Sequence, residues 1–132
     1  GYFNAAPLVA YAKEHGIRMV TLRKARELGV AQCVEQQLKE LAKRVDRVYV
    51  TIDMDVLDIA VAPGVPASTP GGMTAEELFM SLLRIGQHDA VRHIDFVCLD
   101  PSRDVATNAT VKTGVYAWLE FITGRVLAQR GK

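Results

Sequence analysis

Apolar and polar positions follow two periods along the chain, one typical of helices and one typical of strands. Apolar residues at helical spacing predict helices over residues 4–16, 30–44, 74–86 and 111–129. Short β-branched and apolar runs predict strands over residues 17–22, 48–52 and 94–99. Strands that alternate with helices pair in parallel through right-handed crossovers. We therefore expect an α/β fold in which helices cover both faces of a mainly parallel sheet.

Local residue patterns predict where the helices begin and end. Asn4 is a candidate N-cap for the first helix, and Gly16 is its expected C-terminal stop. Thr74 and Glu77 form the T-x-x-E pattern of a capping box at the start of the third helix. In the last helix, the residues expected to face the core are Val115, Trp118, Leu119 and Ile122.

Residues 56–73 form the longest segment without a helical or strand period, and they contain three prolines and three glycines. Long ordered loops in compact domains are usually functional. The strand that precedes this loop runs directly into the sequence Asp53-Met54-Asp55. The sequence therefore predicts a functional loop next to a pair of carboxylates.

Two predicted strands end in carboxylates, which are Asp53 with Asp55 on one strand and Asp100 on another. Side chains at i and i+2 of a strand point to the same face, and open parallel sheets bind ligands at the carboxyl ends of their strands. Adjacent carboxylates repel, and hard divalent ions such as Mg²⁺, Ca²⁺ or Mn²⁺ relieve that repulsion. The alternative is that Asp53 caps the loop while Asp55 and Asp58 are solvated turn residues.

Composition excludes several classes of protein. The 132 residues suit one domain over 1–132, and an apolar content of 49% is enough for a real core. Sixteen basic and fifteen acidic residues give a net charge of +1, so we expect no nucleic-acid partner. Apolar runs stop well short of about 18 residues, so we expect no membrane span. With only Cys33 and Cys98, a reduced, cytoplasmic protein is expected.

Two stretches of the sequence resemble the ureohydrolase family, which comprises arginase, agmatinase, guanidinobutyrase and formimidoylglutamase. The first stretch is V-T-I-D-M-D-V-L-D at residues 50–58, followed by A-P-G at 62–64 and G-G-M-T at 71–74. It resembles the family run S-x-D-x-D-x-x-D-P, a loop with A-P, and G-G-L-T opening a helix. The second, residues 95–104, resembles D-x-x-E-x-N-P-x-x-D. The resemblance implies a three-layer, arginase-like α/β/α fold.

The resemblance also implies a function. Family members are metal-dependent hydrolases of linear C–N bonds in small cationic guanidino or formimino substrates. The two aspartates of D-x-D, which fall on Asp53 and Asp55, are ligands of a centre with two manganese ions in the family. These ions share a hydroxide that attacks the amidine carbon. Family members are typically trimers or hexamers, so a homo-oligomer is expected.

Several departures from the family pattern affect this expectation. The family's other metal ligands lie in G-G-D-H and D-A-H-x-D motifs, and neither motif occurs here. The chain thus resembles only the C-terminal half of such an enzyme, and we expect it to be inactive in isolation. Cys98 stands where the family usually has the Glu that binds the cationic substrate, and losing such a charged acceptor costs about 1.5–3 kcal/mol. Asp100, at the usual Asn, is a candidate for supplying the lost charge. The opening P-G-V of the loop at 63–65 is more similar to formimidoylglutamases than to arginases.

Two alternatives remain open from the sequence. The first is a non-catalytic fragment or degenerate relative that only folds and oligomerises, which the missing ligands and Cys98 support. The second is a Mg²⁺-dependent phosphatase that forms an aspartyl-phosphate, because that class also has D-x-D after an apolar strand. Leu57 disfavours it, since that class has Thr or Val there. The histidines His15, His88 and His93 are predicted to be caps or distant from the carboxylates.

Overall fold

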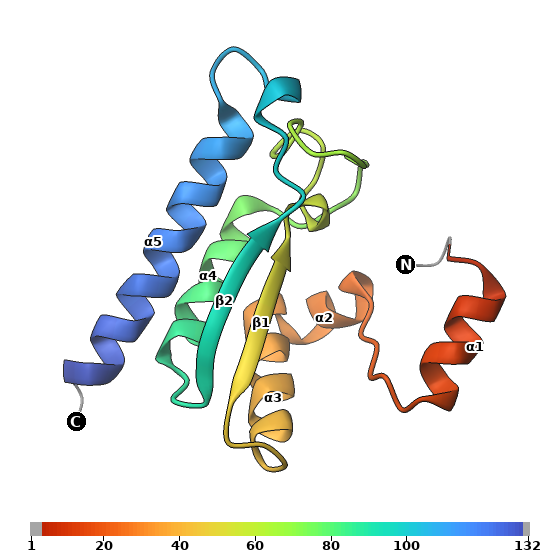
Figure 1. The fold of residues 1–132 in the computed structure, drawn as a ribbon, viewed down its shortest axis with the longest axis vertical. Helices are drawn as coiled ribbons and strands as arrows, with labels where there is room; N and C mark the ends of the chain where they lie inside the picture. The colour runs from red at the N-terminus through yellow and green to blue at the C-terminus, as the bar shows by residue number, and fades with distance from the viewer. Residues whose placement is uncertain (1–3, 131–132) are drawn as a thin grey trace.

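The computed structural model describes residues 4–130, and from residue 30 onward it has the predicted alternation of helices and strands (Figure 1). The strands are β1 (Val48–Asp53) and β2 (Val91–Val97). A 3₁₀ turn follows each strand, at Met54–Val56 and at Pro101–Arg103. The helices are α1 (Ala6–Glu14), α2 (Leu22–Leu28), α3 (Val30–Ala42), α4 (Ala75–Gln87) and α5 (Ala109–Arg130).

The two strands pair in parallel, as the connection through α4 requires. After a shift between Val48 and Tyr49, the register is regular and ends with Asp53 opposite Val97. Because both strands run in the same direction and end together, the residues that follow them lie at the same edge of the sheet. This edge carries the candidate site.

One face of the sheet packs on the helices. Val48 and Ile52 of β1 are buried, whereas Tyr49, Thr51 and Asp53 alternate with them and are exposed. The buried residues that share the core with β1 come from α2, α3, α4, β2, α5 and the segment at residues 54–73, and they include Cys33, Leu38, Leu57, Val65, Leu82, Ile85, Val91, Ala117 and Phe121. The α/β class with a parallel sheet is thus confirmed. Within residues 4–130 the core lies on one side of the sheet, and α1 stands apart from it (Figure 1).

Helices α4 and α5 approach each other so closely that their backbones touch at two glycines. A Cβ atom on Gly86 would lie 2.2 Å from the carbonyl oxygen of Phe121, and one on Gly124 would lie 2.1 Å from that of Leu83. The buried face of α5 consists of the small residues Thr110, Gly114, Ala117 and Gly124 together with Phe121. The predicted inward face was wrong: the exposed fractions of Val115, Trp118, Leu119 and Ile122 are 53%, 43%, 50% and 38%.

The strand predicted at residues 17–22 is absent. Ile17, Met19 and Val20 are about half exposed, and among residues 4–130 no neighbouring strand bonds to this segment. Helix α2, which the sequence analysis did not predict, begins instead at Leu22. The side chain of Thr21 caps it by accepting a hydrogen bond from the backbone N–H of Lys24 at 3.3 Å.

Other predicted boundaries differ by a few residues. The N-cap of α1 is Ala5, not Asn4, whereas Gly16 follows the helix with a positive φ of 65°, as a C-terminal stop requires. The capping box of Thr74 and Glu77 is present. Strand β2 begins and ends earlier than predicted, so Cys98 lies just after it. No helix among residues 4–130 combines the length and the apolar content that a membrane crossing requires.

Candidate metal centre

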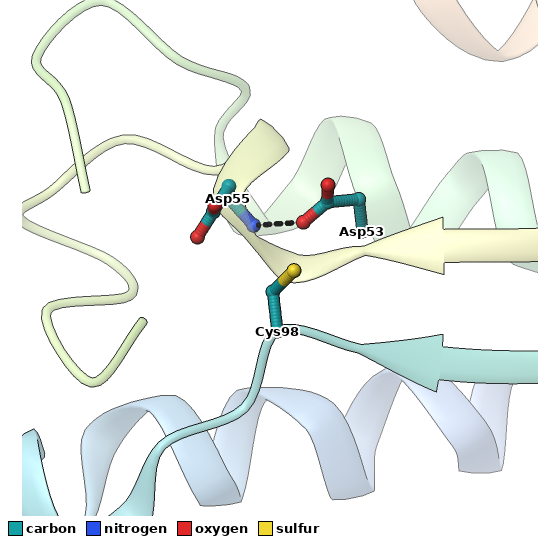
Figure 2. Close-up of side chains that lie close together, drawn as sticks. All are labelled: Asp53, Asp55 and Cys98. Atoms are coloured by element: carbon teal, nitrogen blue, oxygen red, sulfur yellow. Dashed lines mark hydrogen bonds between the residues drawn. The ribbon is translucent and has the colours of Figure 1, made fainter. Parts of the chain in front are cut away.

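The two aspartates predicted to act together lie at the carboxyl end of β1, facing a cysteine from the end of β2 (Figure 2). Asp53 is the last residue of β1, Asp55 lies in the following 3₁₀ turn, and Cys98 directly follows β2. One candidate ligand atom from each of the three side chains lies within 4.8 Å of the other two. Two separate segments of the chain therefore bring together three side chains of types that can bind a metal ion.

A hydrogen bond within the turn orients the two aspartates. The backbone N–H of Asp55 donates to Oδ1 of Asp53 at 3.0 Å, so Asp53 caps the 3₁₀ turn. The capping role that the sequence offered as an alternative is thus real. It is also compatible with metal binding, since a carboxylate that accepts one hydrogen bond keeps further lone pairs for an ion.

Oδ1 of Asp55 is buried and has no hydrogen-bond partner among the described residues. A buried polar atom without a partner costs about 1–3 kcal/mol, and more when it carries charge. A cation would satisfy this oxygen and would also offset the repulsion from Asp53. The donor set therefore fits a divalent ion, which carboxylates bind through oxygen.

The backbone of Cys98 adopts a left-handed conformation with φ of 60°, which is uncommon for a residue other than glycine. Figure 2 shows its Sγ directed toward the side chain of Asp53, and Sγ also lies within 4.8 Å of a carboxylate oxygen of Asp55. A hydrogen bond to Asp53, burial, and the negative charges of Asp53 and Asp55 all raise the pKa of the Cys98 thiol. Without a cation at this place, the thiol is neutral at neutral pH.

Asp100 does not join these three side chains. Its Oδ1 accepts hydrogen bonds from the backbone N–H and the hydroxyl of Ser102 at 3.1 and 2.5 Å, and its Oδ2 pairs with Nε of Arg103 at 2.9 Å. The Ser102 hydroxyl is the main reason why the pKa of Asp100 is lowered. The carboxylate of Asp100 thus organises its own turn, and the structure does not place it where it would replace the charge of the usual Glu.

The loop at residues 56–73 is held at both ends next to the aspartates. Asp58 accepts hydrogen bonds from the backbone N–H groups of Ala60 at 2.8 Å and Gly71 at 2.7 Å, and these bonds lower its pKa. Gly72 packs so tightly that a Cβ there would lie 2.4 Å from the backbone nitrogen of Asp58. Apolar side chains of the loop are also buried in the core, so its backbone contacts and its apolar packing together order it.

A salt bridge that the sequence analysis did not find fixes the exit of this loop. The guanidinium of Arg26 binds both carboxylate oxygens of Glu77, at 2.7 and 2.9 Å, and donates to the carbonyl oxygen of Gly72 at 3.0 Å. The hydrogen bond from Arg26 is the main reason why the pKa of Glu77 falls to about 2. The two partners are 51 positions apart, so no local pattern could reveal this pair.

Asp104 ties the loop to the start of α5. It accepts hydrogen bonds from the backbone N–H and the hydroxyl of Thr110 at 3.2 and 3.0 Å, and that hydroxyl accepts one from the N–H of Gly64 at 2.8 Å. Burial raises the pKa of Asp104, but the bonds from Val111 and Thr110 outweigh it and the net change is downward. This aspartate is structural in the described chain.

The three histidines lie outside the group of Asp53, Asp55 and Cys98. The His15 ring bonds to the carbonyl oxygen of Tyr11 in α1, and the His88 ring accepts from the N–H of Ala90. His93 lies near the start of β2, opposite Tyr49, so the length of the strand separates it from Cys98. The sequence prediction for these residues agrees with their positions.

Comparison with known proteins identifies the family. A family model described as the arginase family matches residues 3–124. Formimidoylglutamases from Halalkalibacterium halodurans and Bacillus subtilis are each 32% identical, over 98% and 96% of this chain and 40% of their own lengths. The solved structure of the Bacillus subtilis formimidoylglutamase superposes with a TM-score of 0.91 at 31% identity, covering 96% of this chain and 40% of that one.

An arginase structure from Bacillus caldovelox has a TM-score of 0.81 at 26% identity, over 91% of this chain and 40% of that one. The chain thus spans about two fifths of the length of the relatives it matches. The family resemblance and the arginase-like fold that the sequence predicted are both confirmed. The match to the family model and the similarity to the two formimidoylglutamases show that the chain belongs to the arginase family.

Proposed function

We propose that this chain is part of a manganese-dependent hydrolase of linear C–N bonds in guanidino or formimino substrates. The observation that carries the proposal is the pairing of Asp53 and Asp55 at the carboxyl end of β1, with a buried Asp55 oxygen that has no partner among the described residues. The names of the relatives, formimidoylglutamase, arginase and agmatinase, support the reaction class. A formiminoglutamase from Trypanosoma cruzi, 21% identical, has a solved structure described with Mn²⁺.

Each residue of the proposed site has a distinct task. Asp53 and Asp55 would hold the metal, and the bond from the Asp55 N–H to Asp53 fixes their relative orientation. When bound, the metal lowers the pKa of water and so supplies a nucleophile near neutral pH. The loop at residues 56–73, which Asp58 and Arg26 hold in place, would line the substrate pocket. By the family resemblance, Cys98 corresponds to the Glu that binds the substrate in relatives, so it would lie next to the substrate.

The described residues supply only part of the ligand set that two manganese ions need. The carboxylates of Asp53 and Asp55 offset only two of the four positive charges of two Mn²⁺ ions. They also supply only part of the coordination, because each Mn²⁺ prefers about six oxygen or nitrogen ligands. The isolated chain should therefore bind Mn²⁺ weakly and turn over substrate poorly, and Cys98→Glu alone should not restore activity. Because its ligand set is incomplete, the chain in isolation should behave as the non-catalytic fragment that the sequence left open as an alternative.

The test is release of urea or formamide from arginine, agmatine, guanidinobutyrate and formiminoglutamate with added Mn²⁺. In a protein that joins this chain to an N-terminal part carrying the G-G-D-H and D-A-H-x-D motifs, Asp53→Ala should remove most of the turnover. His93→Ala is the matched control and should cost little, because His93 lies toward the other end of β2. Equal losses in the two variants would refute the proposed role of Asp53. Strong Mn²⁺-dependent turnover by the isolated chain would instead refute the expectation that its ligand set is incomplete.

A further inference from the structure

Cys98 adds a sulfur donor to a site that otherwise offers only carboxylate oxygens. Its Sγ and one oxygen each of Asp53 and Asp55 lie within 4.8 Å of one another. Around a tetrahedral zinc ion, with Zn–S of about 2.3 Å and Zn–O of about 2.1 Å, such donors are about 3.5 Å apart. Side-chain movements of about 1 Å would therefore bring the three atoms into coordination.

Two independent features of the chain support a ligand at this place. The left-handed backbone at Cys98, with φ of 60°, accompanies a turn of the chain after β2 that directs Sγ toward Asp53 (Figure 2). Separately, Oδ1 of Asp55 is buried in the same group without a hydrogen-bond partner among residues 4–130. The other cysteine, Cys33, is 4% exposed in α3 and belongs to the apolar core.

We infer that Cys98 Sγ is itself a metal ligand and shifts the preference of the Asp53–Asp55 site from Mn²⁺ toward a softer divalent ion such as Zn²⁺. This inference rests on the proposed function, because it uses the same two aspartates. Oxygen donors suit Mn²⁺, whereas thiolates favour Zn²⁺ and related ions. On binding, the S–H bond breaks, a sulfur–metal bond forms and the proton passes to solvent, with no change in oxidation state.

Cobalt(II) provides a direct readout, because a cobalt–thiolate bond produces a charge-transfer band in the near ultraviolet that carboxylate ligands do not give. The full 132-residue chain is titrated with Co²⁺, Zn²⁺ and Mn²⁺ under reducing conditions. We compare the unchanged chain with Cys98→Ser, with Asp53→Asn and with Cys33→Ala as the matched cysteine control. Circular dichroism establishes that each variant is folded.

The band should appear in the unchanged chain and in Cys33→Ala, and it should be lost in Cys98→Ser. Cys98→Ser should weaken Zn²⁺ binding by at least about tenfold while it leaves Mn²⁺ binding within about threefold, since only the softer ion gains from sulfur. Asp53→Asn should weaken the binding of all three ions.

Three outcomes would overturn the inference. One is a band that persists in Cys98→Ser, and another is Co²⁺ binding without a band. In either case, Mn²⁺ binding that depends on Asp53 would leave the proposed function standing. The third is that none of the ions binds with any dependence on Asp53, which would overturn the metal site itself.

Discussion

Neutralising Asp55 should stabilise the metal-free protein and at the same time remove metal binding. Oδ1 of Asp55 has no hydrogen-bond partner among the described residues, and carboxylate oxygens of Asp53 and Asp55 lie within 4.8 Å of each other. Two unit charges at that separation repel by about 1 kcal/mol in water and by about 3.5 kcal/mol at an effective dielectric constant of 20. Because Asp53 is exposed and Asp55 half-buried, the lower value applies. We expect Asp55→Asn to raise the free energy of unfolding by about 1 kcal/mol.

Asp58→Asn is the matched control, with the opposite expected sign. The carboxylate of Asp58 accepts hydrogen bonds from the N–H groups of Ala60 and Gly71 through its two different oxygens. An asparagine keeps only one of these acceptors, so the free energy of unfolding should fall.

Urea unfolding followed by circular dichroism measures both effects, in buffer with a chelator and in buffer with excess Mn²⁺. An ion that binds only the folded state raises the unfolding midpoint. Mn²⁺ should therefore raise the midpoint of the unchanged chain and of Asp58→Asn, but not that of Asp55→Asn. If Asp55→Asn lowers stability in chelator, or keeps its response to Mn²⁺, the electrostatic reasoning about this site is incorrect.

Three further predictions concern packing, pH and association. Gly124→Ala should lower the free energy of unfolding by about 1–3 kcal/mol, because the new Cβ would lie too close to the Leu83 carbonyl oxygen. Gly114→Ala is the control and should leave the free energy of unfolding unchanged, because a Cβ there has ordinary van der Waals contacts. Equal effects of the two substitutions in urea unfolding would contradict the close packing at Gly124. The pKa of Glu77 is about 2, so its contribution to stability is present above pH 4.5 and is lost as the pH falls through 2. Glu77→Gln should flatten the dependence of the urea midpoint on pH in that window, and an unchanged profile would count against the Arg26 pair. Light scattering should show association at micromolar concentration, because the sheet has unpaired edges within residues 4–130, and a stable monomer would contradict this.

Local chemistry was sufficient to predict the parts of the fold that carry the candidate site. The β-branched run of β1, the capping box of Thr74 and Glu77, and the Pro- and Gly-rich loop each have a cause within a few residues of sequence. The rule that parallel sheets bind ligands at the carboxyl ends of their strands placed the candidate site at this edge, and the i, i+2 alternation of a strand predicted that Asp53 and Asp55 act together. The predicted backbone conformation of Asp55 was wrong: Asp55 lies in a 3₁₀ turn that Asp53 caps, and not in an extended strand.

Features that depend on contacts between distant segments could not be predicted. The face that α5 turns toward α4 is set by backbone contact at Gly86 and Gly124, where only glycine leaves room for the facing helix. The apolar residues on the rest of α5 therefore do not decide which face is buried. The segment at 17–21 has a strand-like composition but no neighbouring strand within residues 4–130. The approach of Cys98 to the aspartates accompanies a left-handed backbone conformation that no apolar or polar pattern encodes.

The most direct test of the proposed metal site is a crystal structure of the chain soaked with millimolar Mn²⁺, with anomalous diffraction data that locate manganese. We expect an anomalous peak in contact with the carboxylate oxygens of both Asp53 and Asp55, and no such peak in crystals of Asp53→Ala. An unoccupied position between these carboxylates at saturating Mn²⁺, or manganese bound elsewhere while both aspartates remain unliganded, would contradict the proposed site.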